Sequence, residues 1–286
     1  MTRNIQLLVI DPQNDFCDLP TAWQPTAPTT NTRTAPSLPV AGAHADMQRV
    51  AAFIRAHAAR IDHITVTLDS HQRLDIAHPG FWQQADGRAV APFTPITAAQ
   101  VRAGLFAPRN PAHLPRTLAY LDALEARGRY TLMVWPVHCE IGSWGHGVHA
   151  DVLAACGDWQ LQRQRAVHNV FKGTTPWTEH YSAIEAEVVD AGDPDTALNT
   201  RLLAALDTAD LLLIAGEASS HCVRATTEHI VQHLPRLKKN RARPDHIVLL
   251  TDCMSPVGGF EAAHHAFLDN MCAQGVQLAN SSQIGL

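Results

Sequence analysis

The sequence lacks the features that mark several specialised classes of protein. No apolar run approaches the roughly 20 residues that a membrane-spanning helix needs. The residues after Met1 lack the basic start, apolar stretch and small-residue cleavage site of a signal peptide. The formal net charge is −5 and there is no stripe of Lys and Arg, which argues against a nucleic-acid partner. These absences predict a cytoplasmic protein that binds neither membrane nor nucleic acid.

Cysteine is scattered through the sequence and shows no pairing motif. The six cysteines include no CxxC pair, and in a chain of 286 residues this usage predicts free thiols in a reducing compartment. Hydrophobic residues make up 46% of the chain and charged residues 17%, a globular composition that excludes disorder and allows a substantial core. Histidine is abundant, with 17 copies, and those beside acids or cysteines at strand ends are the candidates for chemistry.

Short apolar runs alternate with longer amphipathic segments. The predicted strands are 6–10, 63–68, 130–134, 166–171, 211–215, 247–250 and 276–278. The predicted helices are 45–61, 117–127 (ended by Gly128), 196–206, 220–234 (capped by Ser220 and stopped by Pro235) and 261–273. This alternation predicts an α/β fold with right-handed crossovers and a parallel sheet covered on both faces.

Two stretches fit no regular element. Residues 21–39 are rich in Pro and Thr, and residues 81–115 are rich in Pro and Ala. We interpret both as insertions or lids within a single domain that spans residues 1–286. No internal repeat is present.

Polar residues follow the apolar strands at five points. Because ligands of parallel α/β sheets bind beyond the carboxyl ends of the strands, these residues are predicted to carry the chemistry. The five segments are Asp11-Pro-Gln-Asn-Asp-Phe16, Asp69-Ser-His71, Trp135-Pro-Val-His-Cys139, Phe171-Lys-Gly173 and Gly216-Glu-Ala-Ser-Ser-His-Cys222.

Three of these strand-end residues suit nucleophilic catalysis. Cys222 begins a predicted helix, whose dipole would lower the thiol pKa and whose N–H groups could bind an oxyanion. Asp11 follows an apolar strand, where desolvation would raise its pKa and suit it to acid–base work. Lys172 could keep Asp11 ionised. Each has a plainer alternative: a small buried Cys222, an Asx-turn or cap at Asp11, and a solvated Lys172.

A second group of strand-end residues suits a divalent metal. Asp69 and His71 are two apart on an extended segment, so their side chains point to the same side. His138 is a candidate third ligand and His78 a possible fourth, a set suited to Zn, Fe or Mn. The alternative is a capping Asp beside a solvated His. Asp75, together with His146 and His149, is interpreted as a bystander. Cys139 is not a ligand beside His138, because adjacent residues point to opposite faces.

The five segments, in this order, resemble the isochorismatase-like cysteine hydrolases, and among them the nicotinamidase/pyrazinamidase group most closely. The resemblance rests on residues 9–16, 69–71, 135–139 and 172–173, on Tyr181-Ser182, and on residues 216–223 with Thr226. It covers nearly the whole chain apart from the two insertions. It implies a three-layer α-β-α fold with a doubly wound, mostly parallel six-stranded sheet.

The resemblance also implies roles for individual residues. Asp11, Lys172 and Cys222 would form a catalytic triad that cleaves a small, heterocyclic carboxamide through a thioester. Asp69, His71 and His138 would bind one divalent metal ion, zinc above iron or manganese, with His78 as a further candidate. Phe16 and Trp135 would sandwich a planar ring. The N–H groups of Ala218 and Cys222 would form the oxyanion hole, with a cis peptide bond between Glu217 and Ala218. A homo-oligomer is expected by analogy with the family.

Three departures from the family pattern keep other functions open. Glu217 stands where an apolar residue is expected, Asp69-Ser-His71 lacks an aromatic residue between the two ligands, and the insertions enlarge the chain. One alternative is a related hydrolase of an N-carbamoyl or other small amide. Another is a non-catalytic, metal-stabilised binding module on the same fold. Isochorismatase chemistry is disfavoured because it needs no cysteine.

Overall fold

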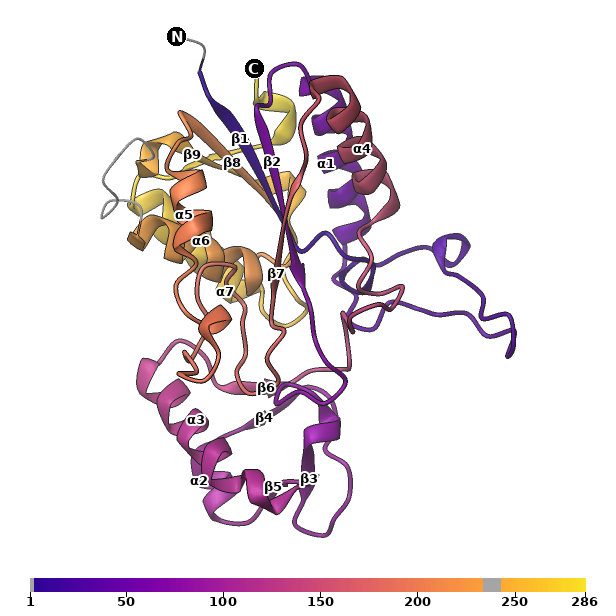
Figure 1. Cartoon of the computed structure of the whole chain (residues 1–286), viewed down its shortest axis with the longest axis vertical. Coiled ribbons are helices and arrows are strands. Elements are labelled where there is room, and N and C mark those ends of the chain that lie inside the picture. The colour runs from indigo at the N-terminus through magenta and orange to yellow at the C-terminus, as the bar shows by residue number, and fades with distance from the viewer. Residues whose placement is uncertain (1–2, 234–242) are drawn as a thin grey trace.

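A parallel sheet of six strands forms the centre of the protein. The computed structural model describes residues 3–233 and 243–286. The strand order is β10-β9-β8-β1-β2-β7, and every neighbouring pair is parallel (Figure 1). The strands are β1 (Ile5–Ile10), β2 (His63–Asp69), β7 (His168–Lys172), β8 (Leu211–Gly216), β9 (Ile247–Leu250) and β10 (Gln277–Ala279). The predicted sheet is therefore confirmed in type and in strand number.

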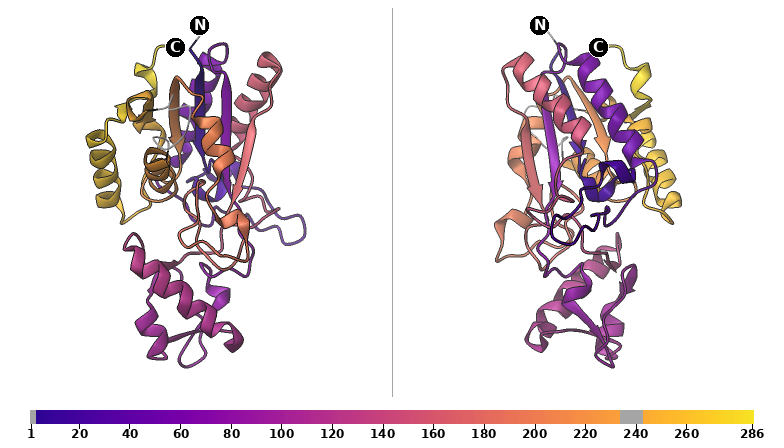
Figure 2. Two further views of the ribbon diagram at one scale, coloured as in Figure 1. Left: turned by 60° about the vertical axis from the view of Figure 1, so that its left-hand side comes forward. Right: turned by 90° about the vertical axis from the view of Figure 1, so that its right-hand side faces the viewer.

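Helices cover both faces of this sheet, as the crossover pattern predicts. Helices α1 (Ala43–His57) and α4 (Ala150–Arg163) pack against each other on one face, and α5 (Thr200–Leu206) and α6 (Cys222–His233) lie on the other (Figure 2). Helix α7 (Glu261–Ala273) packs against α6. The chain moves outward in opposite directions from β1 and from β8, so right-handed crossovers place the two sets of helices on opposite faces.

The strand predicted at 130–134 does not belong to the central sheet. It is β6 (Leu132–Val134), and it pairs antiparallel with β4 (Thr94–Ile96). Leu132 and Val134 pack in a second hydrophobic core with Ile96, so their burial does not need the main sheet. The apolar pattern predicted a strand correctly but could not identify its partner. Helix α4 was not predicted at all.

Residues 81–115 contain regular elements, contrary to the prediction. They form β3 (Trp82–Gln84), α2 (Ala98–Arg102) and β5 (Phe106–Pro108), which pairs antiparallel with β3. With β6 and α3 (Leu114–Arg127) they build a small subdomain around the second core, at one end of the central sheet (Figures 1 and 2). Helix α3 ends at Gly128, as predicted, and Gly128 has the left-handed conformation common at helix ends.

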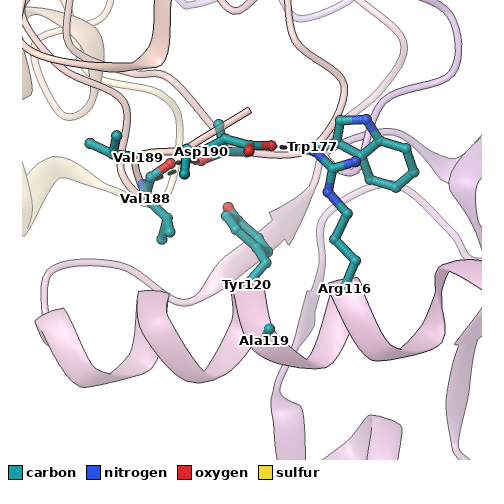
Figure 3. A pocket seen from close by; sticks show the side chains of 9 residues that line it. Arg116, Ala119, Tyr120, Trp177, Val188, Val189 and Asp190 are labelled. Carbon is teal, nitrogen blue, oxygen red and sulfur yellow. Dashed lines mark hydrogen bonds and ion pairs between the residues drawn. The ribbon is translucent and has the colours of Figure 1, made fainter. Parts of the chain in front are cut away.

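The subdomain contacts the segment that follows β7. The Arg116 guanidinium, on α3, lies 4.0 Å from the ring centroid of Trp177 and forms an ion pair with Asp190 (Figure 3). Tyr120, also on α3, accepts a hydrogen bond from the backbone N–H of Glu179 at 3.2 Å. These contacts hold residues 177–190 against the subdomain and so help to position the chain beyond Lys172.

The end of β8 approaches β1 very closely. A Cβ atom on Gly216 would lie 2.0 Å from the carbonyl oxygen of Ile10, and Gly216 has φ +122°. Only glycine fits both conditions. The backbone N–H of Glu217 then donates to the Ile10 carbonyl at 2.8 Å. This contact brings the turn before α6 next to Asp11.

The described part of α6 runs from Cys222 to His233, and its predicted end at Leu234 before Pro235 lies outside the described residues. Within the described residues, no helix is both long and apolar enough to cross a bilayer.

Candidate active site

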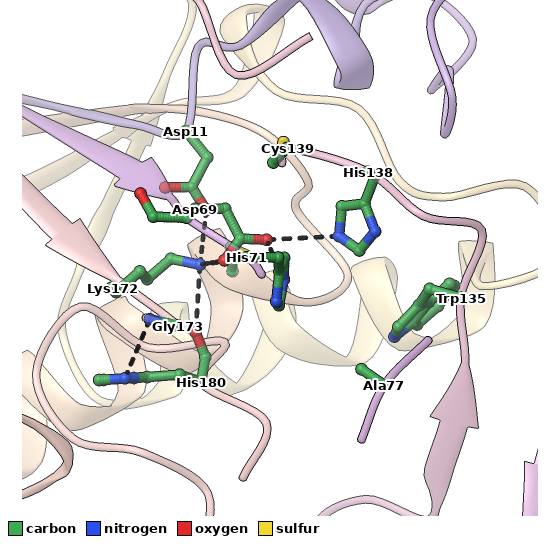
Figure 4. A network of polar contacts seen from close by, with 12 residues as sticks. Asp11, Asp69, His71, Ala77, Trp135, His138, Cys139, Lys172, Gly173 and His180 are labelled. Carbon is green, nitrogen blue, oxygen red and sulfur yellow. Dashed lines mark hydrogen bonds and ion pairs between the residues drawn. The ribbon is translucent and has the colours of Figure 1, made fainter. Parts of the chain in front are cut away.

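Asp11, Lys172 and Cys222 meet at the carboxyl ends of three neighbouring strands. Lys172 Nζ lies 2.9 Å from Asp11 Oδ2 and 3.5 Å from Cys222 Sγ (Figure 4 shows the Asp11–Lys172 contact). A carboxylate oxygen of Asp11 lies within 4.8 Å of the Cys222 sulfur. All three side chains are buried. Thr67 Oγ1 donates to Asp11 Oδ1 at 2.6 Å and fixes the orientation of the carboxylate. The three residues predicted to form a catalytic triad are therefore neighbours in the structure.

Lys172 is held by two carboxylates and one carbonyl group. Its ammonium group contacts Asp69 Oδ1 at 2.9 Å in addition to Asp11, and it donates to the His180 carbonyl oxygen at 3.1 Å (Figure 4). Burial disfavours the charge, but the charges of Asp11 and Asp69 raise the pKa of Lys172 well above its ordinary value. Lys172 is therefore a buried cation, not the solvated lysine of the alternative interpretation.

The two proton-exchanging groups of the cluster both have raised pKa values. Burial raises the pKa of Asp11, as predicted, although Lys172 opposes the shift. Burial also raises the pKa of Cys222 well above its ordinary value, with Asp11 and Asp69 adding to the effect and Lys172 opposing it. The prediction of a thiol pKa lowered by the helix dipole is wrong, because desolvation and two nearby acids outweigh the dipole. A raised pKa favours the thiol form of Cys222, which then needs a base to become a nucleophile.

Beside this cluster three imidazoles converge with Asp69. Candidate ligand atoms of His71, His78 and His138 lie within 4.8 Å of one another. Asp69 Oδ2 is 3.2 Å from His71 Nε2 and 3.4 Å from His138 Nε2. One carboxylate and three imidazoles form a donor set that suits Zn, Fe or Mn.

Asp75 has a specific contact that the sequence prediction missed. Its Oδ2 lies 2.9 Å from His71 Nδ1, on the opposite side of the ring from Asp69. A carboxylate on the second ring nitrogen of a histidine fixes the tautomer and orientation of the ring. Asp75 is therefore not a bystander. The i, i+4 spacing of His71 and Asp75 was visible in the sequence but has no meaning outside a helix until the loop is known.

Two loop segments bring the histidines together. The chain leaves β2 through residues 70–78, enters the subdomain, and returns through residues 135–141. The segments are joined by hydrogen bonds from Trp135 N to Ala77 O at 2.7 Å and from His71 N to Cys139 O at 3.0 Å. This pairing places His138 close to His71, although the strand before His138 lies outside the central sheet.

The turn before α6 has the form expected of an oxyanion hole. Within the described residues, no protein acceptor is found for the N–H of Ala218 or of Cys222. The peptide bond between Glu217 and Ala218 is cis, as the family resemblance implied. The predicted cap at Ser220 is wrong, because α6 begins at Cys222 and Ser220 is not the residue directly before it. The Ser220 hydroxyl instead accepts a hydrogen bond from Val257 N at 3.1 Å.

A narrow cavity opens above the Cys222 sulfur. Phe16 and Trp135 line it, as expected, together with Ala218 and Cys222. The remaining lining residues are Leu38, Asp69, His138, Glu179, Tyr181, His221 and Val257. The cavity is therefore bordered by the cysteine, by the candidate metal ligands Asp69 and His138, and by aromatic side chains.

Comparisons with known proteins establish the fold. No family model and no curated protein matches the sequence. Among solved structures, a nicotinamidase/pyrazinamidase from Acinetobacter baumanii aligns over 98% of both chains, with 18% identity and a TM-score of 0.62. A pyrazinamidase of Pyrococcus horikoshii, solved in complex with zinc, aligns over 97% of this chain and 99% of its own, with 18% identity and a TM-score of 0.51. An isochorismatase-like hydrolase from Alkaliphilus metalliredigens aligns over 98% and 96%, with 14% identity and a TM-score of 0.50.

The fold is that of the isochorismatase-like hydrolases. At these identities the likeness extends to the fold and not to individual residues. The predicted resemblance is thus confirmed at the level of architecture. In this isochorismatase-like fold, Cys222 and two of the predicted metal ligands, Asp69 and His138, line one cavity.

Three lining residues were missed by sequence analysis as site residues. Glu179 is fully buried, and burial raises its pKa to about 8. Tyr181 accepts a hydrogen bond from Trp135 Nε1 at 3.1 Å, and burial lowers the pKa of His221 to about 4. Tyr181 and His221 lie in segments that carry the family resemblance but were assigned no role, and the only signal for Glu179 was its position between Lys172 and Tyr181.

Proposed function

We propose that this protein is a metal-containing cysteine amidohydrolase that converts a small, planar carboxamide into an acid and ammonia. The observation that carries the proposal is the buried contact of Lys172 with both Asp11 and Cys222, directly beneath a cavity. A binding module on this fold would need no buried acid, cation and thiol at one point. The nicotinamidases and pyrazinamidases among the structural neighbours support amide hydrolysis as the reaction.

In the first half of the reaction, Asp11 accepts the proton of Cys222 as the sulfur attacks the carboxamide carbon. The raised pKa of Asp11 suits this role, because a carboxylate of ordinary pKa would be too weak a base. The Ala218 and Cys222 N–H groups donate to the oxyanion of the tetrahedral intermediate. Asp11 then passes the proton to the leaving nitrogen, the C–N bond breaks, and ammonia departs from a thioester.

In the second half, water attacks the thioester. Asp11 removes a proton from the water, the C–S bond breaks, and the sulfur regains its proton from Asp11. Lys172 keeps its charge throughout and stabilises whichever of Asp11 and Cys222 is anionic. The net reaction converts one amide and one water molecule into one acid and one ammonia molecule.

We further propose that Asp69, His71 and His138, with His78 as an additional candidate, hold one divalent metal ion, zinc in preference to iron or manganese. When bound, such an ion supplies a Lewis-acidic site at the cavity wall that can anchor a ring nitrogen or a water molecule. The donor set supports this proposal, as does the zinc reported for the Pyrococcus horikoshii pyrazinamidase.

The lining of the cavity supports a flat substrate. Phe16 and Trp135 provide aromatic surface, and Trp135 is oriented by its hydrogen bond to Tyr181. A pyridine or pyrazine carboxamide is the substrate we favour.

The absence of a CxxC pair and the free state of all six cysteines are consistent with a reducing compartment such as the cytoplasm.

The proposal is tested by ammonia release from nicotinamide, pyrazinamide, an N-carbamoyl amine and simple aliphatic amides. We expect turnover of the two ring carboxamides, with weaker turnover of the aliphatic ones because these lack a ring to stack. Preference for the N-carbamoyl compound would instead identify a related hydrolase of another substrate. Failure of the protein to hydrolyse any of them would contradict the proposed function.

Replacing Asp75 with asparagine should weaken metal binding without removing a ligand. The asparagine side chain can still contact His71 Nδ1 but carries no charge to polarise the ring, so we expect metal affinity to fall by about 10- to 100-fold. The measurement is a competition titration with a chromogenic chelator. His57→Ala, a change on the far helix α1, is the matched control and should bind metal like the wild type. Equal affinity in Asp75→Asn and wild type would contradict the ligand assignment.

A further inference from the structure

Glu217 is a buried acid in the turn that links β8 to α6. Its side chain is fully buried, and its backbone N–H is fixed on the Ile10 carbonyl at 2.8 Å. It directly precedes Ala218, which lines the cavity. The family pattern favours an apolar residue at this position, so the role of the carboxyl group needs a separate explanation.

The two carboxyl oxygens of Glu217 have different surroundings. Oε2 accepts a hydrogen bond from Ser255 N at 3.2 Å. For Oε1, the described residues provide no N–H or O–H donor. Ser255 links this carboxyl group to Asp46 on α1, because its backbone N–H donates to Glu217 and its Oγ donates to Asp46 Oδ2 at 2.6 Å. Asp46 is close enough to raise the pKa of Glu217. Two buried carboxyl groups bonded to the same residue favour sharing a single proton, because two neighbouring buried anions would repel strongly.

The surroundings indicate which of the two acids carries the proton. Asp46 accepts a hydrogen bond from Ser255 Oγ at 2.6 Å and forms an ion pair with Arg49, and both contacts stabilise its anion. Among the described residues, Glu217 has no cation partner. Burial, reinforced by the charge of Asp46, raises the pKa of Glu217 well above its ordinary value, and Asp18 adds to the shift. These surroundings favour the proton on Glu217, from where it could be donated to Asp46 in a charge-assisted hydrogen bond.

Further hydrogen bonds connect this pair to the turn. Ser219 N donates to the Ser255 carbonyl at 2.9 Å, and Val257 N donates to Ser220 Oγ at 3.1 Å. The segment 255–257 is thus bonded to Glu217, Ser219 and Ser220 in succession. Through Ser255 and Glu217, the turn is also tied to Asp46 on α1.

We propose that Glu217 is a positioning residue: as a neutral acid bonded to Asp46 and Ser255, it fixes the turn that presents the Ala218 and Cys222 N–H groups to the substrate. The proposal rests on the proposed amidohydrolase function, since it assigns those N–H groups to the oxyanion. An apolar residue would fill the space but leave the turn without this bond to α1. Glu217 would therefore act on the rate of bond cleavage and not on substrate binding.

The kinetic test compares Glu217→Gln with Glu217→Ala. The glutamine amide can donate to Asp46 and accept from Ser255, so Glu217→Gln should keep kcat within about threefold of wild type. Glu217→Ala should lower kcat by about 10-fold or more, with KM little changed. Complete loss of one oxyanion donor lowers kcat by about 10²- to 10³-fold, and this substitution would misplace the donors without removing them. Glu187→Gln, a buried acid paired with Arg129 away from the turn, is the matched control and should retain wild-type kcat.

Each kinetic outcome decides the proposal. A merely structural role for Glu217 would lower the melting temperature of Glu217→Ala and leave its kcat unchanged, which would overturn the proposal. Loss of kcat in Glu217→Gln as large as in Glu217→Ala would overturn it as well. Rescue by glutamine, together with a kcat loss in Glu217→Ala measured well below its melting temperature, would support it.

Infrared spectroscopy tests the shared proton without any substrate. At neutral pH the difference spectrum of wild type minus Glu217→Gln should contain a protonated-carboxyl band, separated in this way from other buried acids such as Glu179. An active wild type without this band would overturn the inference and leave the proposed function intact. A wild type that shows the band but hydrolyses no amide would overturn the proposed function and with it the positioning role, while the shared proton would stand.

Discussion

Replacing Cys222 with alanine should abolish amide hydrolysis while leaving the protein folded and its metal bound. The sulfur is the only atom in the proposed mechanism that forms a covalent bond from the protein to the substrate carbon, and the described lining of the cavity offers no second thiol beside Asp11. Removing the nucleophile from such a cluster costs about 10⁴- to 10⁶-fold in kcat. The measurement is ammonia release under saturating nicotinamide, with metal content determined on the same preparation.

Cys272→Ala is the control for this experiment, because Cys272 is the exposed cysteine on α7 and lies outside the site. It should retain wild-type activity. Thiol alkylation would be a poorer test than mutation, since Cys222 is buried with a raised pKa and a general reagent would modify Cys272 first. Activity of Cys222→Ala within tenfold of wild type would rule out a thioester mechanism.

Replacing Lys172 with methionine should have the largest effect on stability. Methionine fills the volume of the side chain but leaves Asp11 and Asp69 facing each other in the interior without a cation. Breaking a buried ion pair by removing one partner costs about 3–5 kcal/mol in the free energy of unfolding. Activity should fall with it, because neither the Asp11 carboxylate nor the Cys222 thiolate would be stabilised. Denaturant unfolding and ammonia release measure the two effects.

A second substitution separates charge from packing. In Lys172→Met the pKa of Asp11 should rise further, so adding Asp11→Asn removes one uncompensated carboxylate. The double variant should regain part of the lost unfolding free energy and yet remain inactive, since it has no base. The double-mutant comparison yields the coupling between the two residues. The contrary outcome is simple additivity: Asp11→Asn would then lower the free energy of unfolding by the same amount in Lys172→Met as in wild type. That result would show that the two charges do not interact.

Local features of the sequence predicted the elements of the central sheet well. The six strands and most of the helices follow from apolar runs and caps, because burial on both faces of a parallel sheet demands continuous apolar segments. The prediction failed at 81–115, where strands of three residues are too short to produce a pattern. It also failed for β6, since an apolar triplet does not indicate which sheet it joins.

The sequence singled out several residues that lie together in the candidate site. Asp11, Lys172 and Cys222 were identified from their positions at strand ends, which converge by topology in any doubly wound sheet. Asp75 and Glu179 were missed because they act through loops whose course depends on packing against the subdomain. The direction of the Cys222 pKa was mistaken because a helix N-terminus is visible in a sequence, whereas burial beside two acids is not.

The sequence alone determined which groups stand at the strand ends, because strand periodicity and turn residues are local properties of the chain. Only the tertiary structure decided how far apart those groups lie, which are buried and which protons they keep. Distances and desolvation depend on segments remote in sequence, such as the return of residues 135–141 beside residues 70–78 and the approach of Asp46 to Glu217. Those contacts, and not the residue types themselves, set the acid–base properties of this site.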